Sequence, residues 1–123
     1  NDRIGEICRK KGILFNNADG TTGDLILPAV SSGSHYTIAV TTHGRSPAVS
    51  RFIREHIDER FRMLDQMIVL QETLRRDLKQ TSLSQEQRSA ILMNVIRDAG
   101  IWEALAHSVQ EAEMMARRKY LHA

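Results

Sequence analysis

The sequence predicts an α+β fold with a mixed first half and an all-helical second half. A short continuous apolar run, Ile13–Phe15, and a longer alternating run, Tyr36–Thr42, have the patterns of β-strands. After Pro47, apolar residues recur every three or four positions almost to the C-terminus, which is typical of amphipathic helices. The chain has 123 residues, of which 41% are hydrophobic, so it is long enough to bury a core.

The first predicted elements are a helix and a strand. The helix begins at Asn1 or Asp2 and ends at Gly12, because glycine is the preferred residue just after a helix C-terminus. The run Ile13–Phe15 follows at once and is too continuously apolar for a half-exposed strand. A helix, a glycine and a buried strand in this order are typical of the end of an α/β sheet, which we assign to residues 1–24.

A β-hairpin is predicted next. Its first strand is the apolar run Leu25–Val30, which Pro28 makes an edge strand or an irregular strand because proline has no N–H to donate. The segment Ser31–Ser34 predicts a turn, and Tyr36–Thr42 predicts the returning strand. The hairpin and the helix after it form the second predicted segment, residues 25–60.

The remaining chain is predicted to be helical. Ser46 is a good N-cap and Pro47 suits the first helical position, where the missing N–H costs nothing. The apolar pattern then continues to a break at residues 80–82, with a bend expected near residues 59–62.

Two further helices follow, and they complete a helical segment that we place at residues 61–123. Ser84 and Gln87 form a capping box at the start of one helix, and Gly100 is expected to end it. The last helix is predicted over Ile101–Tyr120.

The composition argues against several classes of protein. The formal net charge is +2 with acidic residues interspersed among the basic ones, so we expect no nucleic-acid partner. A single cysteine, Cys8, excludes an internal disulfide framework and fits a reducing compartment. No apolar run has the length of a membrane span and no signal peptide is visible, so we expect a cytoplasmic protein without a membrane partner.

Two polar turns are the candidate functional segments. The first, Asn16–Asp24, follows the run that ends at Phe15, and the second, Thr41–Ser46, follows the alternating strand. The second turn leads into a helix N-terminus, whose free N–H groups and positive dipole end favour anionic ligands. We interpret the two turns as two sides of one site. No histidine or cysteine cluster has the spacing of zinc ligands, so we expect no resident metal.

Each turn also has a purely structural interpretation. Asp19 followed by Gly20 is an ordinary turn sequence, and the hydroxyls of Thr41 and Thr42 can simply satisfy backbone groups near a strand end.

In order and spacing, these segments resemble the siroheme synthase family, which comprises NAD-dependent precorrin-2 dehydrogenases that are often also sirohydrochlorin ferrochelatases. The shared features are an Asn-x-x-Asp turn at Asn16–Asp19 and an apolar segment that ends at Pro28. A strand, a hydroxyl-hydroxyl-x-Gly-x-Ser-Pro motif and an arginine-rich helix follow, here Val40–Arg54. The resemblance covers about residues 1–60, and the helical remainder carries no diagnostic motif.

The resemblance implies a domain organisation. Residues 1–24 would be the last helix and strand of a truncated NAD-binding Rossmann domain, residues 25–60 would form an intertwined homodimer, and residues 61–123 would be a helical C-terminal domain. The NAD-binding core of the family precedes these motifs, so NAD would be held by a part that this chain lacks, and the fragment alone would be inactive. Where chelatase activity is present, Fe²⁺ is a substrate.

The resemblance also assigns roles to residues. Asp19 would be the catalytic acid/base, and Thr42 would take the place of a hydroxyl that is a serine in some members. The tetrapyrrole substrate, precorrin-2 or sirohydrochlorin, would lie against Asn17, His43, Arg45 and Ser46 as well. Arg45 is the strongest candidate for a substrate carboxylate, because guanidinium groups bind carboxylates in a bidentate manner.

Two other functions are left open by the residues. The amphipathic second half suits a non-enzymatic helical interaction module, in which the first 45 residues only pair subunits. The helix pair Ser84–Tyr120 can also be read as a DNA-binding helix-turn-helix, although Glu103, Glu111 and Glu113 in its second helix disfavour this interpretation.

Overall fold

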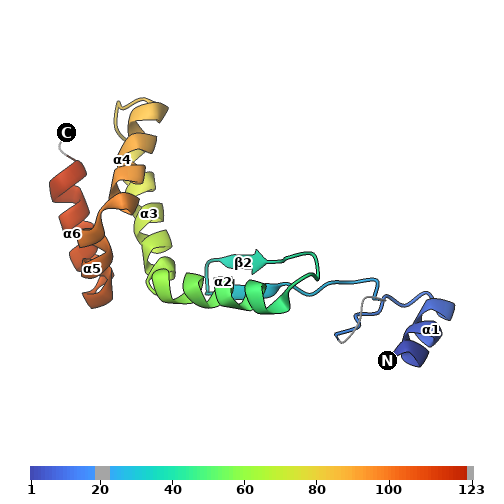
Figure 1. The fold of residues 1–123 in the computed structure, drawn as a ribbon. Helices are drawn as coiled ribbons and strands as arrows, with labels where there is room; N and C mark the ends of the chain where they lie inside the picture. Colours follow the sequence, from blue (N-terminus) through green and yellow to red (C-terminus); the bar gives the residue numbers. More distant parts are fainter. Residues whose placement is uncertain (19–22, 122–123) are drawn as a thin grey trace. The chain divides into compact units, whose positions relative to one another are not determined.

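The computed structural model describes residues 1–18 and 23–121, which divide into two compact units. The first unit contains residues 1–32 and 37–60, and the second contains residues 33–36 and the chain from residue 61 onward. The described residues form helices and a two-stranded antiparallel sheet joined by irregular segments, so the predicted α+β class is confirmed (Figure 1).

Helix α1, Asp2–Lys10, forms and ends as predicted. Gly12 has a φ of 67°, the left-handed conformation that glycine adopts without strain. The chain then turns so that the N–H of Ile13 donates to the carbonyl oxygen of Cys8 at 2.9 Å. The glycine therefore terminates the helix by its backbone conformation.

The predicted strand at Ile13–Phe15 is wrong. Ile13 and Leu14 are 54% and 67% exposed, and none of the described segments pairs with this run as a strand. Instead the carbonyl oxygen of Phe15 accepts from the N–H of Asp24 at 2.7 Å, and the N–H of Phe15 donates to the Asp24 carboxylate at 3.2 Å. A strand needs a neighbouring strand to satisfy its backbone groups, so the apolar run stays irregular here.

The predicted hairpin is confirmed, with shorter strands. β1, Ala29–Ser32, pairs antiparallel with β2, Thr37–Val40, in a register that places Ala29 opposite Val40. The apolar residues before Ala29 stay irregular, because Pro28 has no N–H to donate to a ladder. The predicted turn at Ser31–Ser34 begins two residues too early, since Ser31 and Ser32 belong to β1.

The observed turn, residues 33–36, lies against Asp65. The Asp65 carboxylate accepts from the N–H of Ser34 at 3.0 Å and of His35 at 2.8 Å. These bonds, the Ser34 bond first, hold the pKa of Asp65 below its usual value. A Cβ at Gly33 would collide with the same carboxylate and with the Tyr36 ring, so a larger residue here would displace the Asp65 side chain from its hydrogen bonds.

Helix α2, Pro47–Arg60, runs beside the hairpin (Figure 1). The buried side chains of the hairpin and this helix are polar: Ser31 is 2% exposed and Ser50 is 6% exposed, and the Ser31 hydroxyl donates to Asp58. In contrast, all of the following apolar side chains of the same region are exposed: Leu25, Ile26, Leu27, Val30, Val49, Phe52 and Ile53. The described part of the first unit thus buries no hydrophobic side chain.

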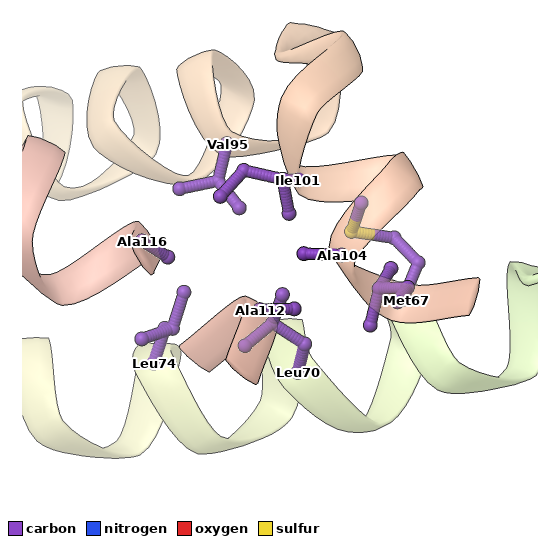
Figure 2. Close-up of a cluster of buried hydrophobic side chains, with 9 residues drawn as sticks. Met67, Leu70, Leu74, Val95, Ile101, Ala104, Ala112 and Ala116 are labelled. Atoms are coloured by element: carbon purple, nitrogen blue, oxygen red, sulfur yellow. The ribbon is translucent and has the colours of Figure 1, made fainter. Parts of the chain in front are cut away.

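The second unit has a hydrophobic core among four helices. These helices are α3, Leu64–Leu78; α4, Gln85–Arg97; α5, Ala99–His107; and α6, Val109–Tyr120. Figure 2 shows side chains from all four helices pointing toward one another. Leu70, Leu74, Val95 and Ile101 are fully buried, and the small residue Ala112 lets α6 approach closely.

The helix boundaries confirm some predictions and correct others. The bend expected near residues 59–62 is a break between α2 and α3, and the capping box of Ser84 and Gln87 is present. Gly100 does not end a helix: α4 ends at Arg97, and Gly100 lies in the first turn of α5. The predicted last helix is two helices, because the Ser108 side chain accepts from the N–H of Glu111 at 3.0 Å and caps α6.

The Asp98 side chain forms hydrogen bonds with both α5 and α6. As the N-cap of α5, its carboxylate accepts from the N–H of Gly100 at 2.8 Å. It also accepts from Lys119 Nζ at 2.9 Å and from the Tyr120 hydroxyl at 2.7 Å. These bonds, the Lys119 bond first, lower the pKa of Asp98 to about 2.

We expect Asp98→Ala to destabilise the second unit by roughly 1–3 kcal/mol, since it removes a cap and a charged acceptor. The folded-state pKa of Asp98 lies below its ordinary value of 3.8, so the contribution of the carboxylate is complete above about pH 4 and is lost as the pH falls toward 2. Thermal unfolding followed by circular dichroism should therefore show a gap between wild type and variant that narrows over this range. Glu103→Ala, on the exposed side of α5, is the control; a constant gap would contradict the assignment.

Candidate functional site

The candidate site of the first unit is the turn that connects β2 to α2. His43 and Gly44 both have positive φ, 54° and 77°, so the backbone reverses over two residues. The N–H of His43 donates to Thr41 Oγ1 at 3.1 Å, and the N–H of Arg45 donates to the Thr42 carbonyl oxygen at 3.1 Å. The side chains of His43 and Arg45 are exposed on this reversed turn.

The Thr42 hydroxyl closes the turn onto α2. It accepts from the Ser46 N–H at 2.9 Å and donates to the Ser46 carbonyl oxygen at 2.9 Å. The Ser50 hydroxyl donates to it at 3.3 Å, and Ser46 caps α2 by accepting from the N–H of Val49 at 3.3 Å. The predicted N-cap is confirmed, and the Thr42 hydroxyl has the structural role that the alternative interpretation gave it.

Thr42→Val should loosen this turn, because the isosteric side chain leaves the Ser46 N–H without its acceptor. We expect amide hydrogen exchange at Ser46 to accelerate roughly tenfold, which corresponds to about 1.4 kcal/mol. NMR-detected exchange measures this effect. Thr42→Ser retains the hydroxyl and is the control; equal protection in the valine and serine variants would show that the hydroxyl is dispensable.

A cleft of about 260 Å³ adjoins the turn. This volume is below the range of roughly 300–1,000 Å³ that is usual for small-molecule sites, so the described residues alone do not enclose a macrocycle. A ring substituent fits, and a whole tetrapyrrole needs further walls. The lining includes Leu27, Pro28, Thr41, Thr42, Gly44 and Pro47.

The arginines near the turn differ in their pairing. Arg51 Nε donates to Glu55 at 2.9 Å and Arg54 donates to Asp58 at 2.9 Å, so both are neutralised on their own helix. The Arg45 guanidinium has no hydrogen-bond or ion-pair partner within residues 1–18 and 23–121. Of these three cations, Arg45 is therefore the one whose charge is not neutralised by a carboxylate of the described residues.

In the first polar turn, the structure describes the residues where the two arms of the loop meet. A Cβ at Gly23 would lie 2.8 Å from the backbone nitrogen of Asn17 and 3.1 Å from the carbonyl oxygen of Phe15, so glycine permits the two arms of the loop to touch. Asn17 is half-buried beside this contact. Asp19, the predicted catalytic residue, lies outside the described residues, as do residues 20–22.

One contact links the second turn to the segment after the first. A Cβ at Gly44 would lie 3.4 Å from the Ile26 side chain, and Ile26 follows Asp24 by two residues. The chain that leaves the first polar loop thus packs on the second polar turn. The idea that both turns form one site stays a prediction, since it depends on Asp19.

Comparison with known proteins adds one relative. No family model and no solved structure matches the chain. A curated protein, precorrin-2 dehydrogenase of Methanosarcina barkeri (strain Fusaro / DSM 804), is 35% identical over 121 residues, which cover 98% of this chain and 52% of the relative. The chain therefore spans about half the length of that relative.

The predicted resemblance to the siroheme synthase family is confirmed. The sequence motifs that indicated this family end near residue 60, yet the similarity covers nearly the whole chain. The helical second unit, which carries no motif, is thus part of the relationship to the siroheme synthase family as well.

The described residues do not fit the NAD that the family requires. The turn from β2 to α2 has a single glycine, Gly44, where dinucleotide sites have Gly-x-Gly-x-x-Gly between a strand and a helix. This turn therefore lacks the close backbone approach by which a dinucleotide pyrophosphate is held. Within the described ranges there is also no group of three or more metal-binding side chains and no helix long and apolar enough to cross a membrane.

Proposed function

We propose that this chain is the dimerisation and substrate-binding part of a siroheme-biosynthesis enzyme that oxidises precorrin-2 to sirohydrochlorin with NAD. The observation that carries the proposal is the similarity of 98% of the chain to a precorrin-2 dehydrogenase. The turn from β2 to α2 supports it, because Arg45 is unpaired among the described residues and the turn is held in place by Thr42.

Precorrin-2 oxidation transfers a hydride to NAD and releases protons from the macrocycle. In the proposed enzyme Asp19 accepts such a proton, and Arg45 orients the substrate through one of its carboxylates. Asn17, His43 and Ser46 complete the ring contacts, and NAD binds in a part of the enzyme other than this chain. Insertion of Fe²⁺ into sirohydrochlorin also displaces ring protons, so we extend the role of Asp19 to metal insertion, with Fe²⁺ as a substrate.

A homodimer is part of the proposal. The described part of the first unit buries Ser31 and Ser50 but no hydrophobic side chain, while Leu27 and Phe52 are 71% and 59% exposed. Apolar surface on a small unit without a core is stabilised by burial against a partner. An intertwined dimer through the segment that begins near Leu25 would cover this surface.

Sedimentation and an absorbance titration with sirohydrochlorin test the proposal together. We expect a dimer that binds the tetrapyrrole and binds NAD poorly. Phe52→Glu should shift the chain to a monomer, and Met114→Glu, at a residue of α6 that is 67% exposed, should not. A dimer with no affinity for sirohydrochlorin would favour the non-enzymatic interaction module instead, for which the exposed apolar surface is equally suitable.

A further inference from the structure

A groove with two chemically different ends runs along α3 and α4 in the second unit. One end, of about 650 Å³, is apolar, and the other, of about 400 Å³, is basic. Arg75 and Leu92 line both clefts, so the two clefts adjoin each other at these residues. Each volume falls in the range that is typical of small-molecule sites.

The apolar end is preformed. The rings of Phe61 and Trp102 lie with their centroids 6.0 Å apart at an interplanar angle of 56°. The Trp102 indole N–H donates to the Ile96 carbonyl oxygen at 2.7 Å, which fixes the ring. Gln71 Nε2 donates to the Leu92 carbonyl oxygen at 3.1 Å and holds α3 against α4. Leu64 and Ile68 complete an aromatic and aliphatic wall.

The basic end collects three cations from two helices. Arg75 and Lys79 are four residues apart at the end of α3, and Arg88 faces them from α4. No carboxylate lines this cleft, and none of the three side chains forms an ion pair with an acidic residue in the described ranges. Like charges around one cleft repel each other, so an anion bound there would relieve their repulsion.

Two other basic residues of the same unit are neutralised by carboxylates. Arg117 pairs with Asp77 and Glu113, and Lys119 pairs with Asp98. These bonds raise the pKa of Arg117, the Glu113 bond first. Other arginines of the unit, such as Arg76 and Arg97, also form no ion pair within the described ranges, so what distinguishes the trio is that its three side chains line one cleft. Glu72 lines the apolar cleft together with Arg75, whereas Lys79 and Arg88 line the basic cleft.

We propose that this groove binds an organic polyanion with a flat aromatic body. The aromatic body packs against Phe61 and Trp102, and its carboxylates contact Arg75, Lys79 and Arg88, where guanidinium groups bind them in a bidentate manner. Nucleic acid is disfavoured because its phosphates would need cations along the whole groove, and half of this groove is apolar. The site does not depend on the function proposed for the β2–α2 turn.

Trp102 makes the proposal measurable, because it is the only tryptophan in the chain. Naphthalene tetracarboxylate is the probe, and quenching of Trp102 fluorescence, checked by equilibrium dialysis, measures its affinity. Benzene tetracarboxylate has the same charge with a smaller ring, so we expect it to bind at least several-fold more weakly. Added salt should weaken both probes.

Charge variants locate the binding. Arg88→Gln and Lys79→Gln should each weaken naphthalene tetracarboxylate roughly tenfold, as expected for loss of one charge-assisted contact. Arg76→Gln, an exposed neighbour on α3 that does not line the groove, is the matched control and should change nothing. Arg45→Gln should also leave this affinity unchanged, so the two proposed sites can fail separately. Circular dichroism confirms that each variant is folded.

Three results would overturn the proposal. Unchanged affinity for naphthalene tetracarboxylate in the Arg88 and Lys79 variants would show that the basic end does not bind the probe. Equal affinities for the naphthalene and benzene probes would show that the apolar end does not contact the aromatic body. Tighter binding of a single-stranded oligonucleotide, lost in the same variants, would assign the groove to nucleic acid instead.

Discussion

Asp19→Ala in the full-length enzyme is expected to lower kcat for precorrin-2 oxidation by roughly 10²–10⁴-fold, with little change in thermal stability. Loss of a general base removes a proton acceptor from the transition state, whereas a polar loop residue contributes little to folding. The loop that carries Asp19 is held at its base by Phe15 and Asp24, which are bonded to each other independently of Asp19. The measurement is steady-state turnover of precorrin-2 across pH.

Two isosteric variants distinguish loss of the proton acceptor from a change in the structure of the loop. Asp19→Asn keeps the shape and loses the proton acceptor, so it should be as impaired as the alanine variant. Asp24→Asn retains an acceptor for the Phe15 N–H, so turnover should stay within a few-fold of wild type. Normal turnover by Asp19→Asn would defeat the catalytic assignment.

Leu74→Ala is expected to have the largest effect on stability. Leu74 is 0% exposed and packs in the core of the four helices (Figure 2). Removing its buried methyl groups leaves a cavity that costs roughly 2–5 kcal/mol. The total stability of a small domain is about 5–15 kcal/mol, so the variant should melt more than about 10 °C below wild type.

Thermal unfolding followed by circular dichroism measures this difference. Arg76→Ala is the control, because Arg76 is an exposed neighbour on the same helix and its truncation should change stability by less than about 0.5 kcal/mol. Similar melting temperatures for the Leu74 and Arg76 variants would mean that the observed core does not hold the second unit together.

Features that depend on nearby residues were predicted well from the sequence. The cap at Ser46, the capping box at Ser84 and the helix stop at Gly12 are all present, because each rests on hydrogen bonds or dihedral angles within a few residues. The hairpin also formed as expected, since its strands are adjacent in the chain.

The secondary-structure predictions were wrong where the outcome depends on hydrogen-bond partners elsewhere in the chain. Ile13–Phe15 has the composition of a strand but no strand to pair with in the described chain. Ser108 interrupts the predicted last helix, and the break expected at Gly100 lies at Asp98, whose carboxylate also binds Lys119 and Tyr120, more than twenty residues away. The spacing of apolar residues in the sequence indicates which face of a helix is buried, but it does not indicate hydrogen-bond donors and acceptors that are distant in the chain.

The features of the candidate site also fall into those that the sequence predicted and those that only the structure shows. The order of two polar turns, a proline and an arginine-rich helix identified the family from sequence, because a motif is a property of consecutive residues. The structure added the hydrogen bonds of the Thr42 hydroxyl and the ion pairs of Arg51 and Arg54. Of these three arginines, Arg45 is the one without an ion-pair partner in the part of the chain that the structure describes.

By itself, the sequence determined the fold class, the hairpin and the helix caps, because short-range hydrogen bonding and side-chain periodicity specify them, and its motifs indicated the resemblance to the siroheme synthase family. Only the tertiary structure decided which side chains are buried, where α5 and α6 separate, and that Arg88 joins Arg75 and Lys79 around one cleft. Those outcomes depend on how separate helices pack, and packing brings together residues whose spacing in the chain carries no signal.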